Sequence, residues 1–141
     1  MALALLVMGS NLGNRKENLK RGKLLVERFA GPILRETPPV ETAPFGVTKQ
    51  PPFLNCGLLI ETDHPPLELL RLLKWIEKRA GRYPTYRWGP RVLDVDIALY
   101  EGVKRETEEL KLPHPGLKER PFFREIAREL LGGTHLLFNR L

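Results

Sequence analysis

The sequence predicts an α+β fold, a ferredoxin-like sandwich in which helices pack on an antiparallel sheet. Segments that read as strands and helices follow one another in the order strand, helix, strand, strand, helix, strand, which is the split βαβ pattern. The strand segments are apolar runs bounded by glycine or proline, and the second helix carries a regular apolar stripe. An extra hairpin over Gly102–Leu112 and a C-terminal helix over Phe122–Leu131 follow. We expect residues 1–141 to form one domain.

The first predicted element is a buried strand over Leu3–Met8, because this stretch is apolar and ends at Gly9. It is too short to span a membrane and no basic residues precede it, so we expect neither a signal peptide nor an anchor. The turn from Gly9 to Gly13 has a superficial likeness to a phosphate-binding loop. It lacks the lysine and the spacing of a P-loop, so we interpret it as a tight turn.

A helix and a second strand come next. Asn14 is typical of a helix N-cap, and Glu17 stands three residues further on, as in a capping box. Gly31 is expected to end the helix, and a strand is expected over Ile33–Thr42. The residues expected to face the core from this helix are Leu19, Leu25, Val26 and Phe29.

The second half of the pattern starts with a loop over Ala43–Pro52, which is rich in proline and glycine, and a strand over Phe53–Thr62. Pro65 and Pro66 can open a helix, because the missing N–H of proline costs nothing there. A second, basic loop over Arg82–Arg91 follows the helix. The apolar stripe of this helix consists of Leu69, Leu73, Ile76 and Ala80, with Glu77 at its edge.

The stretch Arg87–Asp96 combines two arginines, a tryptophan, a Gly-Pro turn and two aspartates. After the turn, apolar and acidic residues alternate, which indicates a half-buried strand with Asp94 and Asp96 on one face. Two carboxylates so close repel each other unless a positive charge lies between them, and Mg²⁺ suits that role. A solvated edge strand is the simpler interpretation. The apolar residues of the alternation are Leu93, Val95 and Ile97.

The composition is that of a globular protein, with 42% hydrophobic and 28% charged residues. The net charge of +6 favours an anionic partner, whether a nucleotide, a nucleic acid or an acidic membrane, and does not distinguish among them. The single cysteine, Cys56, excludes an intrachain disulfide and fits a reducing cytosol. We therefore expect a cytoplasmic protein.

Arg87–Asp96 resembles the signature of the 6-hydroxymethyl-7,8-dihydropterin pyrophosphokinases, a family of folate-biosynthesis enzymes. Further motifs of the family follow in the right order. Gly9–Gly13 resembles the turn after its first strand, and Phe53–Asn55 resembles its aromatic-x-Asn element. Leu112–Pro115 and Arg120–Phe122 resemble its later pair of motifs. Each motif is short, so the resemblance rests on their number and order.

The resemblance implies that pyrophosphate is transferred from ATP, as co-substrate, to the hydroxymethyl group of a reduced pterin, leaving AMP. It implies two Mg²⁺ ions held by Asp94 and Asp96. His114, restrained between two prolines, would donate to a phosphate oxygen, and these three residues with Arg82 and Arg91 form the implied catalytic set. The residues that the resemblance assigns to ATP are Glu77, Arg82, Arg87, Trp88, Arg91, Ile97, His114 and Arg120.

The resemblance also implies a flat pterin held between two aromatic rings, with an amide at its edge. Phe53 and Phe122 would supply the rings and Asn55 the amide, although both phenylalanines otherwise read as core residues. Phe123 is an alternative to Phe122, because the sequence after this motif departs from the family pattern. Trp88 would contact the adenine or the pterin, or fill core. The residues assigned to the pterin are Thr42, Ala43, Phe45, Phe53, Asn55, Trp88 and Phe122.

Two other functions stay open at this point. A basic ferredoxin-like domain can be an RNA-binding module, although this chain lacks the aromatic-rich strand of such modules. A catalytically inactive paralogue is the second alternative, and the presence of both aspartates, Arg91 and His114 argues against it. The expected partners are ATP and the pterin, without nucleic acid or membrane, and the expected state is a monomer.

Overall fold

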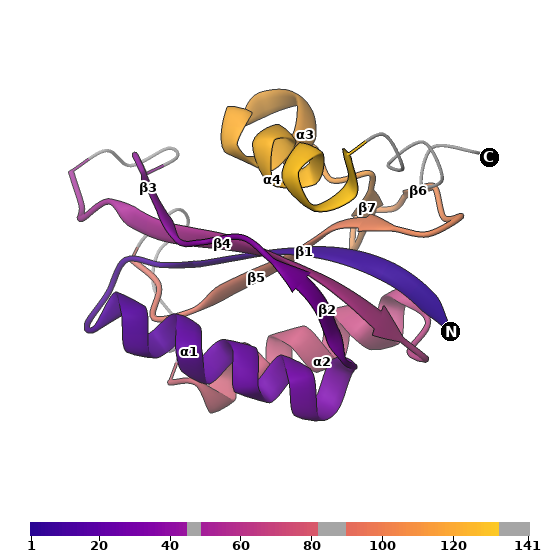
Figure 1. Ribbon diagram of the computed structural model, residues 1–141, viewed down its shortest axis with the longest axis horizontal. Coiled ribbons are helices and arrows are strands. Elements are labelled where there is room, and N and C mark those ends of the chain that lie inside the picture. The colour runs from indigo at the N-terminus through magenta and orange to yellow at the C-terminus, as the bar shows by residue number, and fades with distance from the viewer. Residues whose placement is uncertain (45–48, 82–89, 133–141) are drawn as a thin grey trace.

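A computed structural model of the chain describes residues 1–44, 49–81 and 90–132. A central sheet carries a helical layer on each face (Figure 1). Helices α1 (Arg15–Leu25) and α2 (Pro66–Arg79) cover one face, while α3 (Gly116–Glu119) and α4 (Pro121–Leu131) lie on the other. The described residues therefore form a layered α+β fold, as the sequence predicts.

The main sheet has five strands, which are β1 (Ala2–Ser10), β2 (Ile33–Glu36), β3 (Val40–Thr42), β4 (Phe53–Thr62) and β5 (Asp94–Tyr100). Their order is β2-β4-β1-β5, with β3 also pairing with β4, and these pairs are antiparallel. This order places β1 between β4 and β5, which correspond to the third and fourth strands of the predicted pattern, as the split βαβ pattern requires. Strand β4 has the bounds that the sequence predicts.

The strand predicted over Ile33–Thr42 is split into β2 and β3, which corrects the prediction. Pro38 and Pro39 separate the two pieces, because proline has no N–H to donate to a sheet. Thr37 maintains the link to β4 at the break. Its N–H donates to the Gly57 carbonyl at 3.0 Å, and its hydroxyl accepts the Gly57 N–H at 2.8 Å.

The first helical segment begins at the predicted cap and ends at Gly31, as predicted, but its last part is not α-helical. The Oδ1 atom of Asn14 accepts the Glu17 N–H at 3.2 Å and caps α1. The helix then widens into a π-helical turn, η1 (Val26–Ala30). The prediction that Phe29 faces the core is wrong, because its side chain is 39% exposed and lies edge-on to Trp75, with 5.0 Å between the ring centroids.

The C-terminal part contains the predicted hairpin and helix. Strands β6 (Arg105–Glu106) and β7 (Lys111–Leu112) pair with each other, and α4 ends at Gly132. The short helix α3 was not predicted. Across the described ranges, no helix is long and apolar enough to cross a membrane.

Alternation along the strands divides the core between the two faces of the sheet. The side chains that face α1 and α2 form one cluster, which includes Leu6, Met8, Leu58, Val95 and Ile97. Those that face α4 form a second cluster, which includes Leu5, Val7, Leu59, Phe123 and Ile126.

At Gly57, α4 packs directly on the sheet. A Cβ there would stand 2.1 Å from Cγ2 of Ile126 and 3.2 Å from Cδ1 of Leu130. We expect Gly57→Ala to push α4 outward and to lower the free energy of unfolding by about 1–3 kcal/mol, measured by urea denaturation. Ile126→Ala removes the clashing methyl group, so the double variant should be less destabilised than the sum of the single variants. Simple additivity would contradict this explanation.

Candidate active site

The floor of the site is formed by two rows of residues that pair across β4, β1 and β5. Directly paired residues of antiparallel strands have Cα atoms about 4.5–5.5 Å apart. The rows are two residues apart on each strand, so both face α4. In the strand order β4, β1, β5, one row is Asn55, Gly9 and Asp94, and the other is Gly57, Val7 and Asp96.

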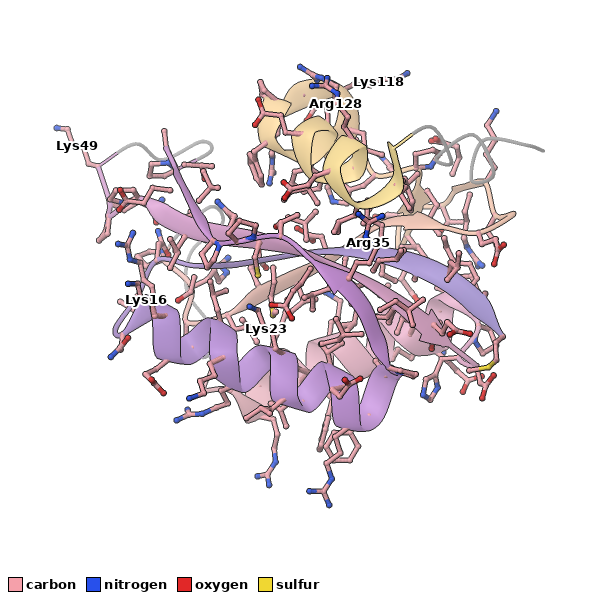
Figure 2. The ribbon with its side chains drawn as sticks, viewed as in Figure 1. Lys16, Lys23, Arg35, Lys49, Lys118 and Arg128 are labelled. Atoms are coloured by element: carbon pink, nitrogen blue, oxygen red, sulfur yellow. The ribbon has the colours of Figure 1, made fainter. Side chains whose placement is uncertain are left out.

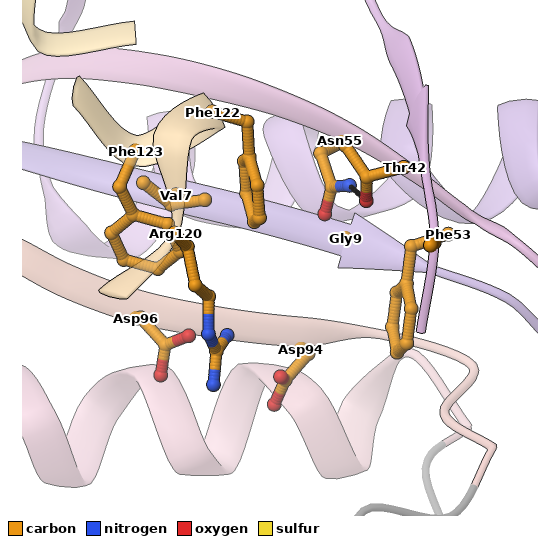
Figure 3. Close-up of a pocket in the computed structure, with 11 residues that line it drawn as sticks. Val7, Gly9, Thr42, Phe53, Asn55, Asp94, Asp96, Arg120, Phe122 and Phe123 are labelled. Atoms are coloured by element: carbon orange, nitrogen blue, oxygen red, sulfur yellow. Dashed lines mark hydrogen bonds between the residues drawn. The ribbon is translucent and has the colours of Figure 1, made fainter. Parts of the chain in front are cut away.

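A pocket of about 380 Å³, partly open to solvent, lies over these rows at the start of α4 (Figure 3). The rings of Phe53 and Phe122 stand on either side of Asn55 and Gly9, and both rings are seen edge-on in Figure 3. The structure therefore brings together most of the predicted residues that it describes. The predicted residues that line this pocket are Thr42, Ala43, Phe53, Asn55, Asp94, Asp96, Arg120 and Phe122.

Gly9 leaves room for the amide of Asn55. A Cβ at this position would lie 2.4 Å from Asn55 Oδ1 and 3.2 Å from Cδ1 of Phe53. Asn55 is only 6% exposed, and its Nδ2 donates a hydrogen bond to the hydroxyl of Thr42. The amide is thus held over the floor of the pocket, with its orientation set by the protein itself.

The adjacent rings of Phe122 and Phe123 have different surroundings. Phe123 is 0% exposed, and its ring centroid lies 4.9 Å from that of Phe122 and 5.0 Å from that of His114. Phe122 is partly buried and lines the pocket opposite Phe53. This arrangement supports Phe122 as the ring that faces a ligand, with Phe123 as a core residue behind it.

The carboxylates of Asp94 and Asp96 share one side of the pocket, with the guanidinium of Arg120 between them in Figure 3. Burial raises the pKa of Asp96 to about 8, with further contributions from the Asp94 and Glu77 carboxylates, while Arg120 acts in the opposite direction. The Asp96 side chain is still 32% exposed, so water screens part of this repulsion. The pocket therefore favours the arrival of additional positive charge.

His114 is held in one tautomer beside these carboxylates. Its Nδ1 accepts the Gly116 N–H at 2.8 Å, which assigns the proton of the neutral ring to Nε2. The Nε2 atom lies 3.8 Å from Oδ1 of Asp96. Burial, together with the nearby Arg120, lowers the pKa of His114 to about 4, so the ring is neutral near pH 7. His114 is thus a neutral N–H donor at the acidic side of the pocket.

Besides His114, three predicted residues that the structure describes do not line this pocket. Glu77 is buried on α2 and its Oε2 accepts the Val95 N–H at 2.8 Å, on the edge strand β5. Ile97 is buried in the core on the α2 side of the sheet, away from Asp96. Arg91 is partly buried and joined through its backbone to Asn11. Their contacts with a nucleotide stay predictions.

Sequence reasoning assigned no ligand role to Val7 or Gly9 and named Phe123 only as the alternative to Phe122, and all three line the pocket. The period of two along β1 puts Val7 and Gly9 on one face, but only the pairing with β5 shows that this is the acidic face. The remaining predicted residues lie outside the described part of the chain, so their roles stay predictions. They are Phe45, Arg82, Arg87 and Trp88.

Asp94 and Asp96 fit a magnesium site that is completed by a substrate. Within residues 1–44, 49–81 and 90–132, no three His, Cys, Asp or Glu side chains gather into a metal-binding group. Mg²⁺ commonly takes only one or two protein carboxylates and completes its shell with phosphate oxygens and water. The pKa of Asp96 is raised by burial and, secondarily, by the neighbouring carboxylates, and a bound divalent cation would stabilise the ionised form against both effects, which supports this fit.

Comparison with known families identifies the chain. The sequence model of the 7,8-dihydro-6-hydroxymethylpterin-pyrophosphokinases (HPPK) matches residues 5–131. The chain belongs to the HPPK family. The matched range includes all the pocket residues described above, so the pocket lies within the part of the chain that defines an HPPK.

Relatives of two lengths share this HPPK region. A 2-amino-4-hydroxy-6-hydroxymethyldihydropteridine pyrophosphokinase from Bacillus subtilis is 39% identical over 121 residues, covering 85% of this chain and 72% of the relative. A protein of the same name from Methylorubrum extorquens is 37% identical, covering 94% and 87%. The mitochondrial folate synthesis bifunctional protein of Pisum sativum is 41% identical over 127 residues, or 90% of this chain. The chain spans only 25% of that bifunctional relative.

Solved structures agree on the fold. An HPPK-DHPS structure in complex with substrates aligns with a TM-score of 0.66 at 13% identity, covering 92% of this chain and 40% of that chain. The HPPK-DHPS of Plasmodium falciparum aligns with a TM-score of 0.64 at 14% identity, covering 99% and 45%. At such low identity the similarity concerns the fold alone, and it confirms the α+β architecture predicted from the sequence.

The raised pKa of Asp96 has a consequence for stability. The folded protein holds the proton of Asp96 more tightly than the unfolded chain does. The stability that depends on this proton is fully present below the pKa of Asp96 in the unfolded chain, and it is lost as the pH rises through the pKa in the folded protein, about 8. Without metal, we expect Asp96→Asn to be more stable than the wild type, with a difference that grows between pH 5 and pH 8. Thermal unfolding in EDTA measures this difference. Glu108→Gln, at an exposed position, is the control, and a pH-independent difference would contradict the expectation.

Proposed function

We propose that this protein transfers the pyrophosphoryl group of ATP to 6-hydroxymethyl-7,8-dihydropterin, giving AMP and the pterin diphosphate for folate biosynthesis. The observation that carries the proposal is one pocket with two kinds of wall. One wall holds two aromatic rings and an amide, and the other holds a pair of carboxylates. The first suits a flat, hydrogen-bonding ring and the second suits metal-bound phosphates. Membership of the HPPK family supports the same reaction.

The pterin would lie between the rings of Phe53 and Phe122, with its edge on the amide of Asn55. An amide offers both a donor and an acceptor, which matches the mixed edge of a pterin. Because Thr42 already accepts one N–H of this amide, Asn55 is oriented before the ligand arrives. Gly9 forms the floor, where any larger side chain would meet the amide.

The phosphates of ATP would lie over Asp94 and Asp96. Two Mg²⁺ ions held by these carboxylates would neutralise phosphate charge and stabilise the charge that develops on the departing α-phosphate oxygen. Arg120 lines the same pocket and acts electrostatically on Asp96, so its guanidinium would be available to a phosphate oxygen once the carboxylates bind cations.

In the proposed reaction the hydroxymethyl oxygen attacks the β-phosphorus of ATP and loses its proton. The bond from that phosphorus to the α–β bridging oxygen breaks, and AMP leaves. Such transfers depend mainly on positioning and charge stabilisation. His114 would donate from Nε2 to an oxygen near the breaking bond, since this N–H lies at the acidic side of the pocket. Arg82, Arg87 and Arg91 would complete the phosphate contacts.

The alternative of an RNA-binding module is less well supported. Such modules stack bases on an open face of their sheet. Here α4 covers the face opposite α1 and α2, and it buries Phe123, Ile126 and Leu130 against the strands. The exposed cations are also spread over both sides of the molecule instead of following one surface. Figure 2 shows the exposed Lys16 on α1, and the exposed Lys118 and Arg128 on the opposite layer.

Product analysis tests the proposed reaction. Incubation with ATP, Mg²⁺ and 6-hydroxymethyl-7,8-dihydropterin, followed by chromatography, should give equal amounts of AMP and pterin diphosphate. Asp94→Asn and Asp96→Asn should each reduce turnover by about 100-fold or more, because a lost metal ligand removes several kcal/mol of transition-state stabilisation. Stoichiometric ADP would mean a different reaction. Near-normal turnover of both variants at limiting Mg²⁺ would exclude their role as metal ligands.

Phe122→Ala should mainly weaken pterin binding, whereas Phe123→Ala should mainly lower the stability of the fold. We expect Phe122→Ala to weaken pterin binding by roughly 5- to 150-fold, since stacking on one aromatic ring contributes roughly 1–3 kcal/mol, and to change stability little. Phe123→Ala should instead lower the free energy of unfolding by about 3–5 kcal/mol, as expected for a fully buried ring. Calorimetric titration with the pterin in the presence of an ATP analogue, and urea unfolding, separate the effects. The reverse pattern would identify Phe123 as the stacking ring.

A further inference from the structure

Asn11 connects three segments of the chain that are far apart in sequence. It follows β1 directly and is 1% exposed. Its Nδ2 donates to Oε1 of Gln50 at 2.8 Å and to the carbonyl of Pro51 at 3.0 Å. Its Oδ1 accepts the N–H of Arg91 at 2.7 Å, and its own N–H donates to the Arg91 carbonyl at 3.0 Å.

These bonds are made to the two segments that lead into the two halves of the proposed site. Pro51 is two residues before Phe53, which forms the aromatic wall. Arg91 is three residues before Asp94, which begins the acidic strand. Asn11 itself does not line the pocket. One buried side chain thus joins the segment that leads into the pterin half to the segment that leads into the phosphate half.

The amide is the group that can make all these side-chain bonds. It donates two hydrogen bonds and accepts one at the same time. An aspartate would keep the acceptor for the Arg91 N–H but would place a second oxygen against the carbonyl of Pro51, which can only accept, and Gln50 would have to turn its amide to donate. Substitution by aspartate would therefore remove the bond to Pro51 and weaken the link to that segment, while it retains the link to Arg91.

From this geometry we propose that Asn11 is a positioning residue, which sets the pterin half of the site relative to the phosphate half. The inference rests on the proposed function, because it requires two substrates that meet in one pocket. Transfer between bound substrates is sensitive to their relative placement, and a shift of about 1 Å can reduce the rate by about 100-fold. Binding of each substrate alone depends on its own half of the site. Loss of the link should therefore lower kcat while leaving both KM values nearly unchanged.

Asn18, on α1, provides a matched control because its amide bonds to the same turn. Its Nδ2 donates to the hydroxyl of Ser10 at 3.1 Å and to the carbonyl of Leu12 at 2.7 Å. Its side-chain bonds stay within the turn and reach neither of the two distant segments. Asn18→Ala therefore weakens the turn locally without removing the connection that Asn11 makes.

The test compares kcat, both KM values and the unfolding temperature of Asn11→Asp, Asn18→Ala and the wild type. We expect Asn11→Asp to lower kcat by about 30-fold or more, as for a small misplacement of substrates, with each KM within about threefold of the wild type. Asn18→Ala should keep kcat within about threefold of the wild-type value, even if its unfolding temperature falls as far as that of Asn11→Asp. If Asn11→Asp does not fold, Gln50→Ala removes one arm of the link and should lower kcat several-fold at unchanged KM.

Other outcomes overturn the inference. An unchanged kcat in Asn11→Asp, or in Gln50→Ala where that variant has to replace it, would show that the link does not position the substrates. A fall in kcat that tracks the unfolding temperature across Asn11→Asp and Asn18→Ala would show a merely structural role. A wild type that forms no AMP and no pterin diphosphate would overturn the proposed function, and this inference with it.

Discussion

The site depends on the register of the edge strand β5 against β1. Val95 and Ile97 are buried on the α2 side of the sheet, so Asp94 and Asp96 face α4. A one-residue slip would exchange the two faces and put both carboxylates into the apolar core. The desolvation cost would be on the order of several kcal/mol for each charge. The apolar side of the strand therefore determines where the acidic side lies, and the pocket follows from it.

Burial and the neighbouring charges also determine the protonation states of Asp96 and His114. Asp96 has an elevated pKa because burial and neighbouring carboxylates oppose its ionisation. Arg120 reduces this effect, but the same guanidinium, added to burial, keeps His114 neutral. Among the described residues that line the pocket, Arg120 is the permanent positive charge beside the acidic pair, and His114 next to Asp96 is a neutral imidazole donor. Such a site has capacity for divalent cations, and it does not need a protonated histidine to bind phosphate near pH 7.

The sequence was sufficient for features that depend on local pattern. The alternation around Asp94 and the bounds of β4 are local properties, and both were predicted. Register is not local, so the pairing of Gly9 with Asn55 and Asp94 could not be derived from any one strand. Phe122 and Phe123 are adjacent on a helix, about 100° apart. Both rings line the pocket, and only the packing of α4 on the sheet shows that Phe123 is fully buried and Phe122 is not.

Gly9 and Gly57 serve opposite purposes on the same face of the sheet. Gly57 has no side chain where α4 packs, so Ile126 can fill the space and the helix covers that end of the face. Gly9 pairs with Asn55 beyond the start of α4, and the space above it holds an amide instead of a helix. The sheet is therefore covered by α4 at Gly57 and open to the pocket at Gly9. This step from closed to open places the aromatic wall next to the acidic wall, which is the arrangement that two-substrate transfer requires.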